Sequence, residues 1–536
     1  MYKESSNKVY KIIKILISIV TKYKQTLKIR RFYKKNFSFK QSSTRIILVE
    51  AFQVPSNEIS ILYFLKSLRS KKDFTPVAFY FNEKNWLNRL KIKVDYLTSP
   101  IYSAGVRRLI IIDTYAKHPK LNNLKMLKSV HGIYSNYDLE NFAYANILIG
   151  DLLYDEFLSD NQCATIDIDD MKCYLQIEKF ILLVNQFNGI FLKLDIEAVL
   201  VSHCVYKWAI PARIAVANNV SAYQVTGESI YRITKTKPFA YTDFFDYPQI
   251  FSSIPGDRRE VGLRIAKTNL DRRFAGEVGV DMPYSTKSAF AVKGVDDLEE
   301  NVLKVNSKIK ILVAVHDFYD SPHPFGFNFY PDIYLWLESL ALLSNKVNFD
   351  WYIKTHPDIQ GIGKIILEDF CNLHPQFNLL PADTSHLNII QDGINFVLTI
   401  WGTVAVEYSY FDIPVINASK NNPHASYKFS ITPNSREEYE SLILNLDKLK
   451  HSIEKTEIYE YYFMNNIYRT KSILFTDYDR YLKEIGGYKN SMSHLAYEYF
   501  LKSNNTRKPS EIIAANIKFI ESNFHCLQPN HQIIIN

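Results

Sequence analysis

From residue 45 onward, the chain alternates between short apolar runs rich in β-branched and aromatic residues and longer stretches with helical spacing. Short apolar runs without a polar face are typical of parallel strands that helices cover on both sides. The first half therefore predicts a parallel α/β sheet. Its expected strands are 46–49, 77–81, 109–112, 147–149, 198–201 and 222–225.

A second series of the same kind follows a charged stretch, and its expected strands are 309–315, 349–354, 396–400 and 414–416. The fold class predicted from this pattern is α/β, with two Rossmann-like domains facing a central cleft (the GT-B architecture) and a helical C-terminal extension. The expected segments are a basic arm (1–43), an N-terminal Rossmann-like acceptor domain (44–250), an inter-domain bridge (251–306), a C-terminal Rossmann-like nucleotide-sugar domain (307–435) and a helical tail (436–536), part of which crosses back to the N-terminal domain.

Charge is concentrated at the start of the chain. Residues 1–40 hold twelve lysines and arginines and one acid, a net charge of +11, whereas the whole chain of 536 residues carries +8. The remaining body is thus nearly neutral, which argues against nucleic acid as a partner. The apolar positions around Ile12, Leu16 and Ile19 make the arm a candidate amphipathic helix on an anionic membrane surface. The alternative is a solvated, partly disordered basic arm.

The apolar run in this arm is too short to span a membrane, and no small-residue cleavage site follows it. The five cysteines are scattered and form no CxxC pair, which indicates a reducing compartment. These features predict a cytoplasmic protein that lies peripherally on the inner face of the cytoplasmic membrane.

The first candidate for chemistry is Lys354 with His356, at the end of an expected strand and just before Pro357. Carboxyl ends of strands are where open α/β sheets bind ligands. A lysine and a histidine side by side suit a phosphate or diphosphate leaving group. The alternative is a surface lysine and a capping histidine.

A second candidate is the segment in which Gly402 and Thr403 separate an apolar strand from a helix that carries Glu407. Glycine and a hydroxyl residue at a helix start expose backbone N–H groups to an anion, and Glu407 can meet ribose hydroxyls. The alternative is an ordinary N-cap with a favourable acid in the first turn.

The loop at 315–323 contains His316, Asp317, Asp320 and His323. Its irregular spacing argues against a metal site, so no metal ligand is predicted. We expect His316, Asp317 and Asp320 to contact substrate hydroxyls or phosphate. In the first half, Glu50, Asp151 and His203 follow expected strands and are candidates for a catalytic base or an acceptor contact. A turn or capping role is the alternative for each.

Together, the Lys354–His356–Pro357 strand end, the Gly402–Thr403–Glu407 segment and the 316–323 loop resemble the bacterial capsule polysaccharide biosynthesis family. This family includes Kdo transferases and is related to GT-B sialyl- and polysialyltransferases with a His-Pro motif. Further similar stretches are 150–155, 273–276 and 329–338, and the resemblance covers about residues 45–419. The acidic-acidic-Gly motif of the sialyltransferases is missing, because only Gln391-Asp392-Gly393 is present and it lies in the second half. The catalytic base and the stereochemical outcome therefore stay open.

The resemblance implies that Lys354 and His356 contact the nucleotide phosphate, and that Gly402, Thr403 and Glu407 contact the rest of the nucleotide. It implies a glycosyltransferase of capsule or lipopolysaccharide assembly, with no cofactor besides its nucleotide-sugar donor. Because Lys354, His356 and the helix start at Gly402 can together offset the charge of the leaving group, we expect the enzyme to need no metal ion. The favoured donor is a CMP-activated ulosonic acid such as Kdo, and the acceptor is a glycan or glycolipid. The alternatives are a nucleotide-sugar epimerase of the same fold and a non-catalytic scaffold of a polysaccharide assembly complex.

Overall fold

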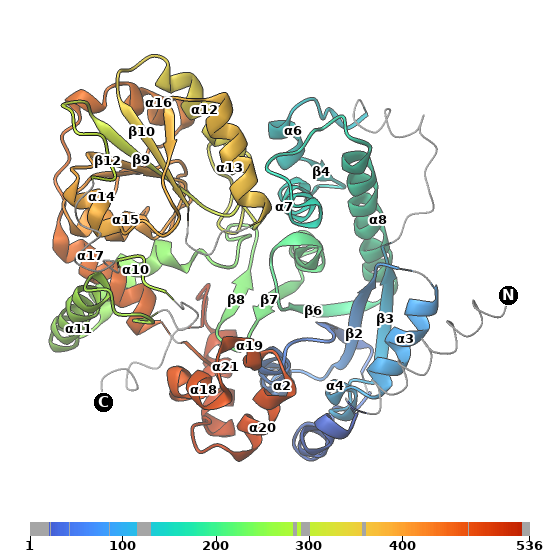
Figure 1. Cartoon of the computed structure of the whole chain (residues 1–536). Helices are drawn as coiled ribbons and strands as arrows, with labels where there is room; N and C mark the ends of the chain where they lie inside the picture. Colours follow the sequence, from blue (N-terminus) through green and yellow to red (C-terminus); the bar gives the residue numbers. More distant parts are fainter. Residues whose placement is uncertain are drawn as a thin grey trace, which may run out of the picture.

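Two parallel β-sheets, each covered by helices, form the framework of the protein (Figure 1). They confirm the predicted α/β fold with two Rossmann-like domains. The computed structural model describes residues 21, 23–41, 43–84, 86–114, 130–281, 287–290, 301–355, 361–469 and 471–527.

The N-terminal sheet has the strand order β3-β2-β1-β6-β7-β8, in which only the edge strand β8 is antiparallel to its neighbour. Its strands are β1 (Arg45–Glu50), β2 (Thr75–Asn82), β3 (Arg108–Asp113), β6 (Asp195–Val201), β7 (Ser221–Val225) and β8 (Ile230–Ile233). The helices of this half are α2 (Pro55–Arg69), α3 (Trp86–Leu97), α4 (Pro100–Ser103), α6 (Asn136–Glu140), α7 (Gly150–Asn161), α8 (Met171–Lys193), η1 (Tyr206–Ala209) and α9 (Ile210–Ala217).

The C-terminal sheet is entirely parallel, with the order β11-β10-β9-β12-β13. Its strands are β9 (Lys310–Val315), β10 (Asp350–Thr355), β11 (Phe377–Leu379), β12 (Phe396–Thr399) and β13 (Val415–Asn417). The helices around it are η2 (Asp243–Asp246), α10 (Tyr247–Ser253), α11 (Gly256–Phe274), α12 (Ile333–Ser344), α13 (Ile362–Leu373), α14 (His386–Gln391), α15 (Val404–Tyr410), α16 (Arg436–Leu444), η4 (Leu446–Lys448), α17 (Lys455–Tyr462) and η5 (Phe463–Tyr468).

Alternation along the central strands explains why both sheets are buried on two sides. In β1, Ile46 and Leu48 pack with α7 and α8, whereas Ile47 and Val49 pack with α2 on the other face. The last helices, α18 (Tyr478–Ile485), α19 (Tyr488–Ser491), α20 (His494–Lys502) and α21 (Pro509–Glu521), lie beside the N-terminal sheet, and α20 and α21 contact α2 (Figure 1).

One predicted strand is wrong in its role. Ile147 and Leu148 form β5, which pairs only with β4 (Ala143–Tyr144) in a two-stranded antiparallel hairpin outside the main sheet. The run is too short to cross the sheet, because α7 begins at Gly150. A Cβ atom at Gly150 would meet the carbonyl oxygen of Leu139, so glycine is required for this close approach.

The predicted boundaries of the arm and the bridge differ from the packing of the described residues. Residues 23–36 form a helix, and Ile29, Tyr33 and Phe39 are buried in the core around α2. This part of the segment 1–43 is therefore docked on the protein, because aromatic residues interleave with its lysines. Likewise, α10 and α11 pack into the same core as β9 and β12, so they belong with the C-terminal sheet rather than with a separate bridge.

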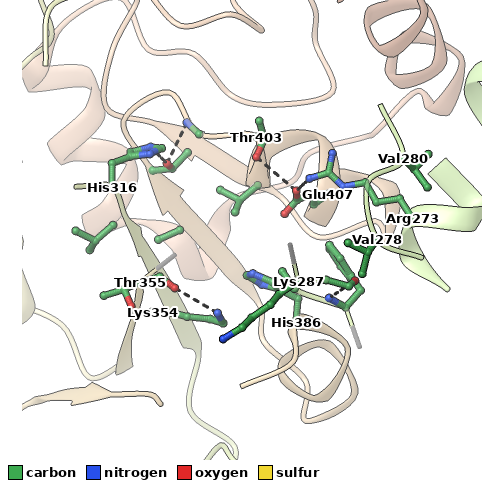
Figure 2. A pocket seen from close by; sticks show the side chains of 18 of the residues that line it. Arg273, Val278, Val280, Lys287, His316, Lys354, Thr355, His386, Thr403 and Glu407 are labelled. Atoms are coloured by element: carbon green, nitrogen blue, oxygen red, sulfur yellow. Dashed lines mark hydrogen bonds and ion pairs between the residues drawn. The ribbon is translucent and has the colours of Figure 1, made fainter. Parts of the chain in front are cut away.

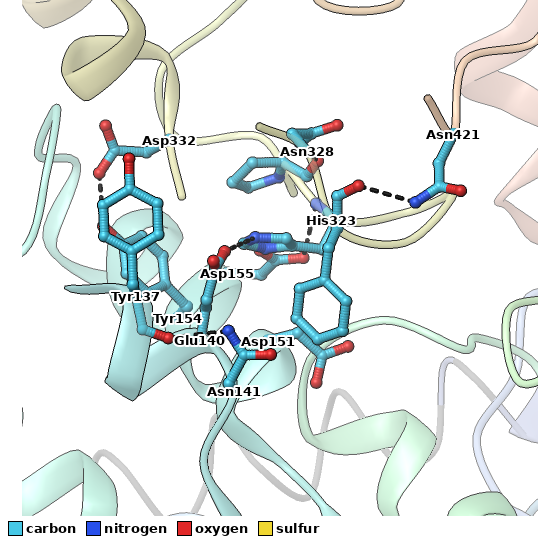
Figure 3. A network of polar contacts seen from close by, with 12 residues as sticks. Tyr137, Glu140, Asn141, Asp151, Tyr154, Asp155, His323, Asn328, Asp332 and Asn421 are labelled. Atoms are coloured by element: carbon cyan, nitrogen blue, oxygen red, sulfur yellow. Dashed lines mark hydrogen bonds and ion pairs between the residues drawn. The ribbon is translucent and has the colours of Figure 1, made fainter. Parts of the chain in front are cut away.

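A buried polar cluster joins the two halves (Figure 3). His323, in the loop after β9, lies between two carboxylates of the N-terminal half: its Nδ1 is 2.5 Å from Asp155 Oδ1 and its Nε2 is 3.0 Å from Glu140 Oε2. Tyr154 adds a second link by donating its hydroxyl hydrogen to Asp332 at 2.5 Å. These side chains are almost fully buried.

Electrostatics favour a charged histidine in this cluster. Burial alone lowers the pKa of His323, but Asp155 and Glu140 outweigh it and raise that pKa to about 10. A positive ring between two carboxylates is a buried ion pair, which is costly to break by removing one partner. The cluster thus fixes the loop after β9 to α6 and α7.

Within the described part of the chain, none of the helices combines the length and the apolar character that crossing a membrane requires.

Candidate functional site

Each sheet has one point at which the strand order reverses direction, between β1 and β6 in the first and between β9 and β12 in the second. In open α/β sheets, ligands bind outside the carboxyl ends of the strands at this switch point. Polar side chains occupy both points. The loops that leave them also touch, since Ser321 after β9 hydrogen-bonds to Tyr206 after β6. The two carboxyl edges therefore face each other.

At the N-terminal switch point, Glu50 ends β1 and Ser202 and His203 follow β6. The Glu50 carboxylate accepts hydrogen bonds from the Ser202 backbone N–H at 2.7 Å and from the Ser202 hydroxyl at 3.1 Å. The same hydroxyl oxygen is 2.8 Å from His203 Nδ1. Glu50 and Ser202 are buried, whereas His203 is exposed. Two of the three predicted base candidates are thus linked through a serine.

Burial raises the pKa of Glu50 to about 7, although hydrogen bonds from Ser202 and Gln53 oppose the shift. A carboxyl group that titrates near neutrality can hold or release a proton under ordinary conditions. Tyr206, three residues beyond His203, has a positive φ of 54°, a backbone conformation that is strained for an aromatic residue. Strain of this kind collects at functional sites.

The third base candidate, Asp151, is in a different environment. Both of its carboxylate oxygens accept hydrogen bonds at 2.5 Å from the guanidinium of Arg213, and Asp151 is 1% exposed. The charge of Asp151 is therefore neutralised by Arg213, and its burial keeps it out of reach of a substrate. The prediction of Asp151 as a base or acceptor contact is therefore corrected: it anchors the start of α7 to α9.

At the C-terminal switch point, His316 follows β9 and Thr399 ends β12. His316 Nε2 is 3.3 Å from Thr399 Oγ1, and its ring stacks on Trp401 with centroids 4.3 Å apart. A Cβ atom at Gly402 would lie 2.8 Å from Thr399 Oγ1 and 2.9 Å from His316 Cε1. Glycine at 402 thus leaves the room that the histidine occupies.

A cavity lies beside this switch point, lined by residues of β9, β10 and the start of α15 (Figure 2). Lys354 projects into this cavity from the end of β10. The side chain is 2% exposed, and its amine donates to the carbonyl oxygens of Thr355 at 3.3 Å and Ala382 at 3.2 Å. Burial lowers the pKa of Lys354 to about 8, against the attraction of Glu407 and Asp383. The amine is thus held at the cavity wall, and it stays charged at neutral pH.

Glu407 in α15 forms an ion pair with Arg273 at the end of α11, and it also accepts a hydrogen bond from Thr403 Oγ1 at 3.4 Å (Figure 2). Thr403 does not cap the helix through its side chain. Gly402, Thr403 and Glu407 all line the cavity, and their contact with a nucleotide stays a prediction. However, the carboxylate of Glu407 is already paired with the guanidinium of Arg273.

Sequence reasoning missed three residues that line this cavity: Arg273, Lys287 and His386. In the sequence, Arg273 lies in the 273–276 stretch similar to capsule proteins, and Lys287 lies in the predicted bridge. The sequence signal for Arg273 is the pair of arginines, Arg272 and Arg273, in the last turn of α11. A helix expected in a bridge between domains does not predict that these arginines face the second sheet. With Lys354, Arg273 and Lys287 give the cavity three cationic side chains, beside the two carboxylates of Glu277 and Glu407.

Two further predicted residues lie apart from this cavity. Asp317 is half-buried and Asp320 is exposed; neither lines the cavity. Asp320 accepts a hydrogen bond from the Ser321 backbone N–H at 2.8 Å. Burial is the main cause that raises the pKa of Tyr206, and the nearby charge of Asp320 raises it further. The predicted contact of these two acids with the nucleotide is therefore not supported by their position. His356 lies outside the described residues.

His323, the fourth polar residue of the 316–323 loop, is held by Asp155 and Glu140 rather than by its neighbours. Among the residues that the structure describes, no three histidines, cysteines, aspartates or glutamates are grouped so that they can hold a metal ion. Independence from metal remains a prediction.

No family model and no curated protein sequence matches the chain. Solved structures of similar architecture include a UDP-GlcNAc 2-epimerase from Neisseria meningitidis bound to UDP-GlcNAc, at 9% identity and a TM-score of 0.22, covering 78% of this chain and 98% of that one. S. aureus MnaA with UDP matches at 13% identity and a TM-score of 0.24, covering 79% and 91%. The wall teichoic acid polymerase TagF matches at 10% identity and a TM-score of 0.19, covering 96% and 99%. At this level of similarity the fold assignment rests on the two sheet topologies described above.

Proposed function

We propose that the protein is a glycosyltransferase that uses a nucleotide-activated sugar and contributes to a bacterial surface polysaccharide. The observation that carries the proposal is the pairing of two chemically different switch points on facing edges. One holds the acid–base chain Glu50–Ser202–His203, and the other holds the cavity with Lys354 and Arg273. Transfer from a nucleotide sugar needs both a proton acceptor and a site for the leaving phosphate.

The donor belongs on the C-terminal side in this proposal. Lys354 and Lys287 line the cavity together with the ion pair of Arg273 and Glu407 (Figure 2). Cations in a partly buried site stabilise the negative charge that develops on a departing phosphate. For the donor we retain the CMP-activated ulosonic acid that the family resemblance implies, with a glycan or glycolipid as acceptor. UDP- and GDP-sugars are the competing donors.

The acid–base chain predicts which nitrogen of His203 acts as the base. Ser202 has one hydroxyl hydrogen, and it donates to Glu50 when that carboxylate is ionised. The Ser202 oxygen must then accept from His203 Nδ1–H, which leaves Nε2 without a proton. Nε2 can accept the hydrogen of an acceptor hydroxyl. Protonation of Glu50 reverses the hydrogen bonds and places the proton on Nε2, which removes the base.

The experiment combines binding and turnover. Thermal shifts with CMP, UDP and GDP identify the nucleotide, because a ligand at 100 times its Kd adds ~2.7 kcal/mol. Release of that nucleotide from its sugar conjugates, with a bacterial glycolipid extract as acceptor, then measures transfer. We expect His203→Gln to reduce turnover by about 10²–10⁴-fold while nucleotide affinity is unchanged. Ser202→Ala should reduce turnover less, since it removes the link and leaves the base.

His131→Gln in the same domain is the matched control and should leave turnover unchanged. Equal turnover of His203→Gln and the wild type contradicts the assignment of the base. Failure of every nucleotide to bind contradicts the proposed function as a whole.

The acid–base chain also supports a second candidate function, that of a nucleotide-sugar epimerase, because epimerisation needs a proton donor and acceptor beside the bound sugar. The two functions differ in what happens to the donor alone in D₂O. An epimerase incorporates deuterium at a sugar carbon without an acceptor, whereas a glycosyltransferase leaves the carbon-bound hydrogens in place and needs an acceptor for efficient nucleotide release.

The proposed location is the cytoplasmic face of the membrane, where a glycolipid acceptor is within reach. Residues 1–20 carry the apolar positions of the predicted amphipathic arm and lie outside the described residues. The helix at 23–36 contributes exposed lysines, but its apolar face is used for docking on the core.

A further inference from the structure

Helix α3 exposes a continuous stripe of large apolar side chains on the N-terminal domain. Trp86, Leu87, Leu90, Val94 and Leu97 are between 43% and 64% exposed. Large apolar residues scattered singly over a surface need no explanation, but a contiguous stripe marks an interaction site.

The spacing shows that this stripe is one face of the helix. The opposite face buries Ile92 and Tyr96, and α3 contacts β2 and β3. At about 100° per residue, Trp86 and Leu87 mark the two borders of an apolar arc roughly 100° wide. Lys93 lies just beyond the first border and Lys91 just beyond the second, and both are exposed. Lys91 also forms an ion pair with Asp95 of the same helix at 3.0 Å, so Lys93 and the helix at 23–36 carry most of the positive charge of this surface. An apolar stripe with lysines on both shoulders is the pattern of a helix that lies in a membrane interface.

A second basic element lies close to α3. The helix at 23–36 docks where the chain continues after α3 and α4: Arg30 donates to Ser103 Oγ at 2.9 Å, and the Phe39 backbone N–H donates to the carbonyl of Ala104 at 2.8 Å. Figure 1 shows this dark-blue helix beside α4. Residues 23–41 contain no acid, and their exposed basic side chains are Lys24, Lys28, Arg31, Lys34, Lys35 and Lys40.

We infer that α3 is a membrane-docking element that inserts its apolar stripe into the interface of an anionic bilayer, with the helix at 23–36 supplying positive charge beside it. Charge decides the occupant, because a neutral protein partner gives no reason for lysines on both shoulders and an acid-free basic helix nearby. Each lysine near an anionic leaflet adds to the attraction between the protein and the bilayer. Trp86 at one end of the stripe is the residue type enriched at membrane interfaces.

The position of α3 relates this surface to the acid–base chain, and this step rests on the proposed function. The helix begins directly after β2, whose carboxyl end lies at the same edge of the sheet as Glu50. Glu83, just before α3, forms an ion pair with Lys207 at 2.8 Å, four residues beyond His203. A bilayer that holds α3 would therefore present the head group of a lipid-linked acceptor near His203.

The test uses the full chain and co-sedimentation with vesicles of phosphatidylglycerol and phosphatidylcholine, or of phosphatidylcholine alone. The triple variant Leu87→Ser/Leu90→Ser/Val94→Ser removes three of the five apolar side chains of the stripe without touching the core. We expect it to weaken binding to anionic vesicles at least tenfold. Leu192→Ser is the matched control, since Leu192 is 88% exposed on α8 of the same domain and lies outside the stripe.

Charge is tested separately. Lys28→Glu/Lys35→Glu should weaken binding to anionic vesicles and leave the weak binding to phosphatidylcholine unchanged. Raising the salt from ~0.1 M to ~1 M should reduce the wild-type affinity, because the Debye length falls from ~10 Å to ~3 Å.

Three outcomes overturn the inference. Unchanged vesicle binding by the triple serine variant shows that the stripe does not insert. A dimer of the wild type that this variant dissociates shows that a second copy covers α3. Loss of binding on deletion of residues 1–20, with full binding by the serine variant, assigns the anchor to that segment alone. Nucleotide binding is measured on the same samples, so a failure of the proposed function is seen independently of membrane docking.

Discussion

The two switch points have the same topology and opposite chemistry. One lies between β1 and β6 and the other between β9 and β12, and in each sheet the first of these is the first strand along the chain. Both switch points place a histidine and a hydroxyl residue beside each other. At the N-terminal point, His203 pairs with Ser202 and the buried carboxylate of Glu50. At the C-terminal point, His316 pairs with Thr399 beside a cavity wall that includes Lys354.

The difference lies in the third partner of each histidine. Glu50 behind Ser202 sets the tautomer of His203, and burial lowers the pKa of that ring below its ordinary value. Trp401, in contrast, stacks on His316 and fixes that ring in place. Burial then shifts the two neighbouring charged groups in opposite directions, raising the pKa of Glu50 and lowering that of Lys354. One fold repeated twice thus places a buried carboxyl group at one switch point and a buried amine beside the other.

The largest expected effect comes from breaking the link that holds the two points opposite each other. His323→Asn leaves Asp155 and Glu140 buried without a cation, and removal of one partner of a buried ion pair costs about 3–5 kcal/mol. We expect a lower Tm and a strong loss of turnover. Nucleotide affinity should change little, because the cavity lies within the C-terminal half.

His424→Asn is the matched control. His424 is equally buried but contacts the rings of Phe429 and Tyr461, and burial lowers its pKa to about 3, so it carries no charge. Its loss should lower Tm less and leave turnover unchanged. If both variants lower turnover equally, His323 contributes packing alone.

A smaller effect is expected at the C-terminal point alone. Lys354→Met removes a hydrogen bond from a charged group to the phosphate, worth ~1.5–3 kcal/mol, so the nucleotide Kd should rise about ten- to a hundredfold. Tm without nucleotide should not fall, because the variant also removes the cost of burying a charge. Titration calorimetry measures both variants, with exposed Lys346→Met as the control. An unchanged Kd in Lys354→Met places the phosphate elsewhere.

The sequence predicted the alternation of strands and helices well, because the strands are nearly all apolar and both faces are covered. It also predicted the residues at strand ends, since Glu50, His203, Lys354 and Gly402 follow directly from the pattern. It failed where function depends on partners far along the chain. In the sequence, nothing separates Asp151 from the other acids at strand ends. Only the structure shows that Arg213, 62 residues later, binds it.

The same limit applies to charge and to packing. The lysines at 23–41 predict an arm that does not pack on the core. The structure shows instead that Ile29 and Tyr33 in this segment are buried in the core. Arg273 has no function in a bridge, and only the folding of α11 against α15 and α17 directs it to Glu407. Long-range ion pairs leave no periodic signal in a single sequence, so these assignments needed the structure.

The smallest expected effect, a pH profile, tests both switch points in one experiment. Glu50 must be ionised for His203 to act as a base, so kcat/KM should rise with pH through about 7, the raised pKa of the buried carboxyl. Lys354 must be charged to bind the donor, so kcat/KM should fall again above about 8, the pKa that burial lowers. The phosphodiester of the donor does not titrate in this range, so the bell-shaped profile reports on the protein. Glu50→Gln should reduce the activity and move the acid limb to lower pH, where His203 itself takes a proton. Lys354→Arg, whose guanidinium stays charged, should remove only the alkaline limb. An alkaline limb that persists in Lys354→Arg assigns that ionisation to another group.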